Sequence, residues 1–223
     1  MKWAQPSEGL AASVNGHRLA EALRLLVLTD PECRHPGGVV EGVRAALDAG
    51  CRAVQLRHKS ASANELYHMA CRLGSLTRAA GALLFVNDRV DVALAAGADG
   101  VHLGPDDLPP RAIRHALPPG FLLGVSCDDP AQARLLVDQG ADFVGCGTVY
   151  PTRSKADAGE AIGLEGLRAV VEAVSVPVVG IGGITADRYR DVLSTGAAGA
   201  AVLGAVMEAP HAGEAVRAFL EQG

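Results

Sequence analysis

Aromatic side chains are scarce in this chain, at 4% of its 223 residues. An aromatic-rich β-sandwich is therefore a poor match, whereas the 27 glycines fit close packing of helices on strands and tight turns between them. Positive charge is also in short supply, because 20 Lys and Arg stand against 25 Asp and Glu, for a net charge of −5. We therefore expect no sequence-independent binding of nucleic acid, which needs an excess of basic residues.

Long apolar runs and paired cysteines are missing as well. No stretch approaches the roughly 18 apolar residues of a membrane span, and residues 1–12 contain no apolar core of a secretory signal. The five cysteines include no C-x-x-C pair, and no histidines are grouped with them at zinc-site spacing. An odd number of scattered cysteines does not indicate a disulfide framework. We expect a cytoplasmic protein with reduced thiols and no membrane partner.

What the chain does contain is a regular alternation of short apolar runs and amphipathic stretches, from Leu23 to the C-terminus. The predicted strands are Arg24–Thr29, Ala53–Arg57, Leu83–Asn87, Gly100–Leu103, Leu122–Ser126, Phe143–Thr148, Pro177–Ile181 and Ala198–Leu203. The predicted helices are Val39–Ala49, Ala63–Ala80, Val90–Ala96, Arg111–Ala116, Pro130–Gln139, Leu164–Val174, Ala186–Ser194 and Ala212–Gln222. Continuous apolar strands separated by helices indicate a parallel sheet covered by helices.

Eight such units predict an α/β fold of the (β/α)₈ TIM barrel type, near the lower size limit of about 200 residues for that fold. An open, doubly wound sheet is the alternative, but it rarely contains eight regular units, and no G-x-G-x-x-G follows the first strand. We assign residues 23–223 to one catalytic barrel domain and residues 1–22 to a short N-terminal extension, in which residues 9–18 form an extra helix or a loose arm.

Active sites of such barrels lie at the carboxyl ends of the strands and in the loops that follow, and polar residues gather there in this chain. Gln55 and Arg57 alternate along the second predicted strand, so both can point inward, and Lys59 lies just beyond. Arginine binds phosphate through two N–H groups and lysine acts as a point charge, so the trio suits a diphosphate. The alternative is that these side chains fill the top of the barrel and form salt bridges with a neighbour.

Asp88 and Asp107 follow neighbouring strands, which places their carboxylates close together. Such a pair either repels or shares a hard cation, and Mg²⁺ is commonly held by one or two carboxylates together with substrate phosphate oxygens. The alternative is that each aspartate caps a helix N-terminus. That alternative is strongest for Asp107, because Asp106 beside it could replace it in a metal site.

Thr152, Ser154 and Lys155 provide two hydroxyls and an ammonium group in a loop that could close over an anionic substrate, or that could be a solvated turn. His102 lies inside the fourth predicted strand, where a core residue is more usual than a catalytic base.

Glycines follow the last two predicted strands, as Gly182-Gly183 and Gly204. In this fold the loops at these positions commonly bind phosphate on backbone N–H groups.

Six motifs carry a resemblance to a known family: Gln55-x-Arg57-x-Lys59, Asn87-Asp88-Arg89-x-Asp91-x-Ala93, Gly100-Val101-His102-Leu103-Gly104-x-x-Asp107, Gly124-Val125-Ser126, Tyr150-Pro151-Thr152-x-Ser154-Lys155 and Gly180-Ile181-Gly182-Gly183-Ile184. In order and spacing, from about Leu26 to Met207, they resemble the thiamine-phosphate synthase family. The resemblance implies an enzyme that joins 4-amino-2-methyl-5-pyrimidinylmethyl diphosphate to 4-methyl-5-(2-phosphooxyethyl)thiazole. The products are thiamine monophosphate and pyrophosphate, and the cofactor is Mg²⁺.

The same resemblance implies roles for individual residues. Catalytic groups would be Arg57, Lys59, Ser126 and Lys155. Substrate would be bound by these four and by Gln55, Asn87, Thr152, Ser154, Gly183, Leu203 and Gly204. Mg²⁺ would be bound by Asp88 and Asp107. The expected partners are the two small-molecule substrates, and a homo-oligomer is left open.

The chain departs from the family pattern at three places. Pro105 stands where Gln is usual, Cys127-Asp128 follows Ser126 where His is common, and Gly204 replaces a usual Ser. Two other functions compete: a thiazole tautomerase-like paralogue on the same barrel, and a phosphate-ligand sensor without catalysis. The combined metal and diphosphate set favours the synthase over both.

Overall fold

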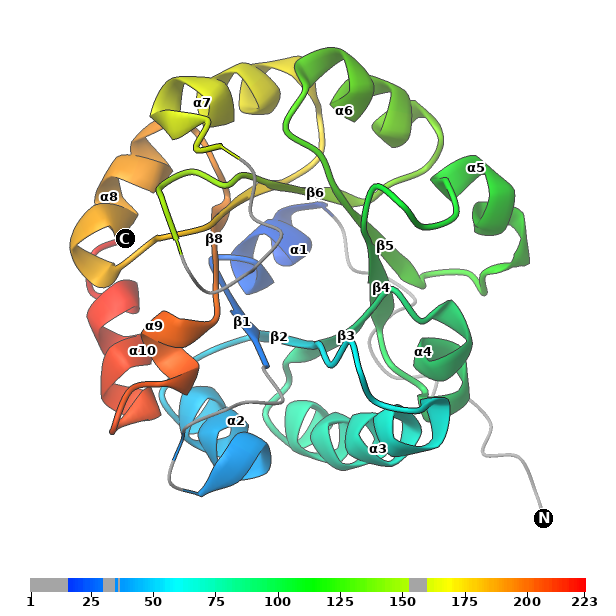
Figure 1. Ribbon diagram of the computed structural model, residues 1–223, viewed down its shortest axis with the longest axis vertical. Helices are drawn as coiled ribbons and strands as arrows, with labels where there is room; N and C mark the ends of the chain where they lie inside the picture. The colour runs from blue at the N-terminus through cyan, green and yellow to red at the C-terminus, as the bar shows by residue number, and fades with distance from the viewer. Residues whose placement is uncertain (1–15, 30–34, 36, 153–159) are drawn as a thin grey trace.

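The chain folds into a closed barrel of eight parallel strands in chain order (Figure 1). The computed structural model describes residues 16–29, 35, 37–152 and 160–223. The strands are β1 (Leu25–Leu28), β2 (Ala53–Leu56), β3 (Leu83–Asn87), β4 (Gly100–Leu103), β5 (Leu122–Ser126), β6 (Phe143–Cys146), β7 (Val178–Ile181) and β8 (Gly199–Val202). Because β1 pairs with both β2 and β8, the predicted TIM barrel is confirmed and the open sheet is excluded.

A ring of helices surrounds the barrel, as Figure 1 shows. The helices of the ring are α2 (Gly38–Asp48), α3 (Ala63–Ala79), α4 (Val90–Ala96), α5 (Pro110–Ile113), α6 (Pro130–Asp138), α7 (Gly163–Ala173), α8 (Ala186–Ser194), α9 (Gly204–Met207) and α10 (Ala212–Leu220). A further helix, α1 (Gly16–Ala22), lies inside this ring in the view of Figure 1. The stretch predicted as one helix over Arg111–Ala116 is α5 followed by a 3₁₀ turn, Arg114–Ala116. The short helix α9 was not predicted. Among the described residues, no helix has both the length and the apolar character to cross a bilayer.

The strand predicted over Phe143–Thr148 ends two residues earlier, at Cys146. The next residue, Gly147, has φ of +151°, and a Cβ atom built there would lie 2.0 Å from the carbonyl oxygen of Ile181. The Val149 N–H then donates to that same carbonyl at 2.8 Å. The chain therefore leaves the strand at a glycine that allows a close approach to β7.

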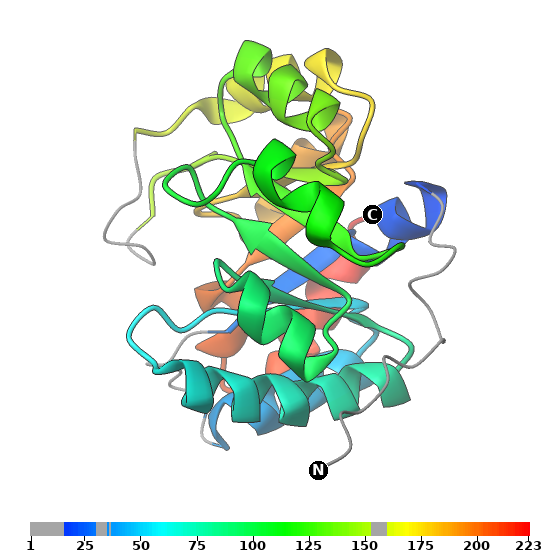
Figure 2. The same cartoon turned by 90° about the vertical axis from the view of Figure 1, so that its right-hand side faces the viewer.

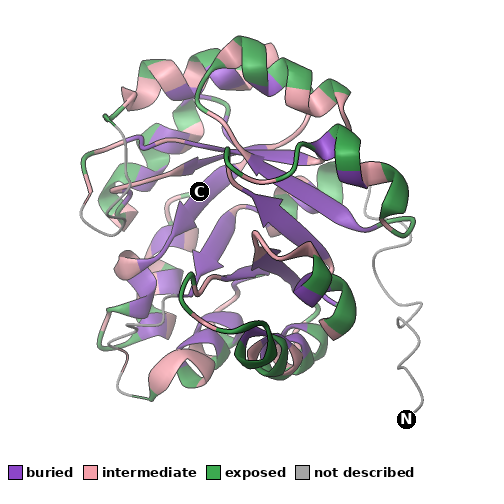
Figure 3. Ribbon diagram, turned by 45° about the vertical axis from the view of Figure 1, so that its right-hand side comes forward, coloured by how far each residue is buried: buried purple, intermediate pink, exposed green. Residues whose placement is uncertain are grey.

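Two apolar clusters form the core. The larger lies between the sheet and the helices, and the smaller fills the barrel, where the rings of Phe85 and Phe143 meet edge to face with centroids 5.1 Å apart. Strands are buried while the outward faces of the helices are exposed (Figure 3). Leu19 of α1 joins the inner cluster, and α1 lies across the amino ends of the strands (Figure 2). The barrel is therefore closed at one end by packed side chains.

Candidate active site

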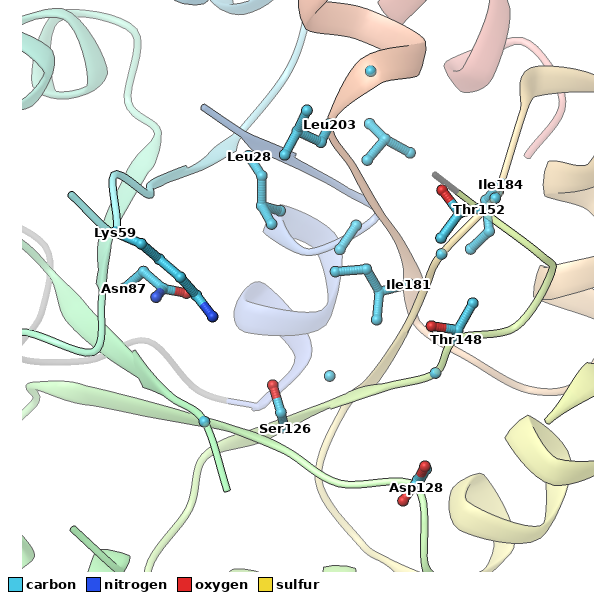
Figure 4. A pocket seen from close by; sticks show the side chains of 18 of the residues that line it. Leu28, Lys59, Asn87, Ser126, Asp128, Thr148, Thr152, Ile181, Ile184 and Leu203 are labelled. Atoms are coloured by element: carbon cyan, nitrogen blue, oxygen red, sulfur yellow. The ribbon is translucent and has the colours of Figure 1, made fainter. Parts of the chain in front are cut away.

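A cavity of about 1010 Å³ opens at the carboxyl ends of the strands. Figure 4 shows Lys59 and Asn87 on one side of it and Thr152 and Ile184 on the other. The volume is at the upper end of the roughly 300–1,000 Å³ usual for small-molecule sites. It is therefore large enough for two small substrates at once.

The three side chains predicted to hold a diphosphate lie at different depths. Gln55 is buried inside the barrel, beneath the main cavity. Lys59 lines the cavity and points into it (Figure 4). Arg57 is not among the residues that line the cavity, yet its charge and that of Lys59 both act to lower the pKa of Asp88. Two positive charges thus act on the acidic side of the site.

Asp88 and Asp107 lie together on this side and line the cavity. Neither caps a helix: the N-cap residues of α4 and α5 are Arg89 and Pro109, and neither forms a side-chain cap hydrogen bond. Instead, the Asp107 carboxylate accepts a hydrogen bond of 2.7 Å from the Gly104 N–H. The capping alternative for the two aspartates is therefore wrong.

The backbone and the proton affinity of Asp88 are both unusual. Among the described residues, it is the one non-glycine residue with positive φ, at 63°, a conformation that costs most side chains roughly 1–2 kcal/mol but Asn and Asp less. Burial raises the pKa of the Asp88 carboxyl to about 6, and the Asp107 charge and a hydrogen bond between the two side chains add to that effect. Strain of this kind is typical of functional sites.

The donor set of this pair fits Mg²⁺ rather than a transition metal. The described residues contain no group of three or more His, Cys, Asp or Glu side chains able to hold a metal ion. Mg²⁺ keeps several waters and is bound through one or two carboxylates and substrate phosphates. The two carboxylates repel each other, which disfavours the ionisation of both. A bound Mg²⁺ would relieve that repulsion.

Ser126 is the last residue of β5 and lines the cavity. Its Oγ lies 2.9 Å from Nε2 of His102, which is buried in the barrel with its ring 5.4 Å from that of Phe143. His102 is a core residue, as predicted, but one that contacts a predicted catalytic hydroxyl. Sequence reasoning missed this positioning contact, although Ser126 and His102 both project inward from neighbouring strands.

The opposite side of the cavity contains the residues predicted to bind the second phosphate. Thr152, Gly183, Leu203 and Gly204 all line it, and Gly204 begins α9. Gly183 has φ of +61°, and a Cβ atom there would lie 2.7 Å from the carbonyl oxygens of Tyr150 and Pro151. Only glycine fits this contact between the loops after β6 and β7 without strain.

Two predicted residues, Ser154 and Lys155, lie outside the described residues. Sequence reasoning also missed cavity residues that the structure reveals: His58, Arg89, Asp128, Thr148, Ile181, Ile184 and Arg188. All but Arg188, which lies in the first turn of α8, are at a strand end or in the loop that follows, so their position could have been predicted. Which of them face the cavity depends on side-chain direction, which the sequence pattern does not specify.

Known proteins are similar to this chain in sequence and in fold. The family model described as Thiamine monophosphate synthase matches residues 25–206. A thiamine-phosphate synthase of Pyrococcus furiosus is 45% identical over 207 residues, covering 92% of this chain and 98% of that protein. The thiamine biosynthesis bifunctional protein ThiM/ThiE of Symbiobacterium thermophilum is 48% identical over 204 residues, covering 92% of this chain and 42% of that longer protein.

A solved structure gives the same result in three dimensions. The thiamine phosphate pyrophosphorylase from Pyrococcus furiosus superposes with a TM-score of 0.84 at 44% identity, covering 92% of this chain and 96% of the other. The family model, the relatives and the structure agree over most of the barrel. The chain belongs to the thiamine monophosphate synthase family.

Proposed function

We propose that this transferase couples 4-amino-2-methyl-5-pyrimidinylmethyl diphosphate to 4-methyl-5-(2-phosphooxyethyl)thiazole, giving thiamine monophosphate and pyrophosphate, with Mg²⁺ as cofactor. The observation that carries the proposal is the arrangement of one cavity. A carboxylate pair and Lys59 lie on one side, and a glycine turn suited to phosphate lies on the other. Two anionic substrates can thus be held with their reacting carbon and nitrogen between them.

The protein's part in the reaction is to bind, orient and neutralise charge. Asp88 and Asp107 would hold Mg²⁺, which when bound supplies positive charge to the departing pyrophosphate. Lys59, Arg57 and Lys155 would add fixed positive charge to the same leaving group, and such preorganised electrostatics is usually the largest catalytic contribution. Ser126, oriented by His102, would donate a hydrogen bond to it.

Bond making requires no protein nucleophile in this scheme. The electron-rich aminopyrimidine can delocalise the cation left when the C–O bond to diphosphate breaks. The thiazole nitrogen then donates its electron pair to that carbon. Gln55 and Asn87 would orient the pyrimidine and its diphosphate, while Thr152, Ser154, Gly183, Leu203 and Gly204 would fix the thiazole phosphate.

The test is to mix the purified protein with both substrates and Mg²⁺ and to follow pyrophosphate and thiamine monophosphate together. We expect both products only when all three components are present. Lys59→Met should lower kcat by roughly 10²–10³, by analogy with loss of one oxyanion donor. Lys59→Arg, which keeps the charge, should lose less. Binding of the thiazole phosphate without pyrophosphate release by the wild type would contradict the proposal and favour a tautomerase or a sensor.

A cytoplasmic location and reaction with small molecules alone belong to the same proposal. Cell fractionation would test the first. Light scattering would show whether a homo-oligomer forms.

A further inference from the structure

Arg188 lies in the first turn of α8 and lines the cavity on the side formed by the loops after β6 and β7. Its Nη1 donates a hydrogen bond of 2.9 Å to the Gly183 carbonyl. Its guanidinium carbon lies 4.7 Å from the ring centroid of Tyr150, within the range of a cation–π contact. Arg188 therefore connects the two loops that meet at the predicted phosphate-binding turn.

The neighbouring residue fixes how α8 presents this arginine. Tyr189 is fully buried, its hydroxyl donates to the Arg24 carbonyl at 2.5 Å, and its ring meets Phe219 edge to face. A helix anchored by Tyr189 cannot rotate about its axis without losing these contacts. Arg188, one residue earlier, is consequently held at the rim of the cavity.

The turn beneath Arg188 has its carbonyl groups occupied and its N–H groups available. The Gly182 carbonyl accepts from the Tyr150 N–H at 3.1 Å, and the Gly183 carbonyl accepts from Arg188. In a trans peptide the N–H points opposite to the carbonyl. The N–H groups of Gly183 and Ile184, in those same two peptides, donate to no other described residue. Both residues line the cavity, so the turn presents two donors of the kind that bind anions.

The other cationic side chains of the described lining are committed elsewhere. Arg89 forms a two-point ion pair with Asp91, at 2.6 and 2.9 Å. Lys59 acts on Asp88 on the opposite side of the site. No described carboxylate forms an ion pair with Arg188, and its bond to Gly183 uses one of the five N–H groups of a guanidinium. Arg188 thus has donors to spare beside the turn.

We propose that Arg188 is a specificity-determining residue whose guanidinium binds the phosphate of the thiazole substrate and selects it over the unphosphorylated alcohol. This rests on the proposed function in placing that phosphate at the Gly182–Ile184 turn. The guanidinium lies on the carbonyl side of the turn and the backbone N–H groups on the other side. The N–H groups would therefore hold the phosphate in the turn, and the guanidinium N–H groups that Gly183 does not use would reach a further phosphate oxygen at the rim. Because Arg188 is exposed at the rim, water weakens its contribution, which we expect to be about tenfold.

The experiment compares Arg188→Met and Arg188→Lys with Arg190→Met, an exposed arginine of the same helix that does not line the cavity. For each variant, kcat/KM is measured with the thiazole phosphate and with the thiazole alcohol, and the binding of both is measured by calorimetry without the pyrimidine substrate. Arg188→Met should lower kcat/KM and affinity for the phosphate about tenfold, leaving the values for the alcohol and the KM of the pyrimidine diphosphate unchanged. Arg188→Lys should lose less, and Arg190→Met should match the wild type.

Three results would overturn the inference. An equal loss for phosphate and alcohol would mean that Arg188 only positions the loops. A rise in the KM of the pyrimidine diphosphate alone would mean that Arg188 binds that substrate and not the thiazole phosphate. No loss in either variant, with an unchanged Tm, would remove Arg188 from the site. Failure of the proposed function is distinguishable, because calorimetric discrimination between phosphate and alcohol does not require turnover.

Discussion

Nε2 of His102 lies 2.9 Å from Oγ of Ser126, across the neighbouring strands β4 and β5. Gly124 faces His102 in the strand register and makes this contact possible. A Cβ atom at Gly124 would lie 2.6 Å from His102 Nδ1 and 2.3 Å from the Phe143 ring. The absence of one side chain therefore lets an imidazole reach the serine from within the barrel.

This contact predicts coupled losses of activity. His102→Leu should lower kcat about tenfold, because the Ser126 hydroxyl loses the partner that orients it. Ser126→Ala should lose a similar factor. The double variant should lose little more than either single one, since both changes remove the same interaction. Losses that multiply in the double variant would contradict the positioning role of His102, and a melting curve for each variant checks the fold.

Substitution of Asp88 should have two separable effects, one on backbone strain and one on the binding of Mg²⁺. Asp88→Ala places a Cβ-bearing residue at φ of 63° without the local hydrogen bonding that makes Asn and Asp tolerant there. It should therefore be less stable than Asp88→Asn by about 1 kcal/mol. Both should lose most of the rise in Tm that Mg²⁺ gives the wild type. Asp106→Asn, an exposed neighbour that also lines the cavity, should keep the rise if Asp88 and Asp107 are the carboxylates that hold the ion. Equal Mg²⁺ stabilisation of wild type and Asp88→Asn would exclude this metal site.

The raised pKa of Asp88, about 6, predicts how stability changes with pH in metal-free protein. The folded state keeps this proton up to about pH 6, whereas an unfolded aspartate loses it near pH 4. Between these values the folded protein binds more protons, so the contribution of Asp88 to the free energy of unfolding falls as pH rises. Urea unfolding with chelator should therefore show the wild type losing stability relative to Asp88→Asn from about pH 4 to 6.

Mg²⁺ competes with that proton, so its affinity should weaken as pH falls below about 6. A titration of Tm against Mg²⁺ concentration at several pH values would measure this change in affinity. Parallel pH profiles for wild type and Asp88→Asn would refute both expectations.

Replacement of Arg114 should lower the stability of the fold and leave catalysis unchanged. Its guanidinium donates to the carbonyls of Gly140 and Phe121, at 3.0 and 2.8 Å, and pairs with the Asp142 carboxylate. These contacts lie at the amino ends of β5 and β6, where barrel residues serve stability. Arg114→Ala should lower the free energy of unfolding by about 2 kcal/mol with unchanged KM values. Arg111→Ala, an exposed arginine of α5, is the matched control. An unaltered Tm in Arg114→Ala would show that the pair contributes nothing.

Sequence pattern predicts the fold well where local and tertiary preferences agree. The strands Leu83–Asn87, Gly100–Leu103 and Leu122–Ser126 have the predicted bounds, because each apolar run ends where the chain leaves the barrel for the following loop. The end of β6 differs because it depends on Gly147 meeting Ile181, a residue far along the chain. Helix α9 has four residues, too few for any helical period to appear in the sequence.

The candidate site could also be predicted where the order of the strands decides a position, and not where side-chain direction decides it. Topology brings strand ends together, so Asp88, Asp107 and Lys59 could be predicted as neighbours from the order of the chain alone. The direction of a long side chain could not: Arg57 does not line the cavity and Arg188 does. The roles of Ser154 and Lys155 stay predictions, because both lie outside the described residues.

Because α1 and the inner apolar cluster close the amino end of the barrel, ligands reach the cavity from its carboxyl end. Substrates and products therefore share one end of the barrel as their route, and a product that is still bound hinders the entry of the next substrate. Inhibition of the steady-state rate by pyrophosphate and by thiamine monophosphate should measure this competition.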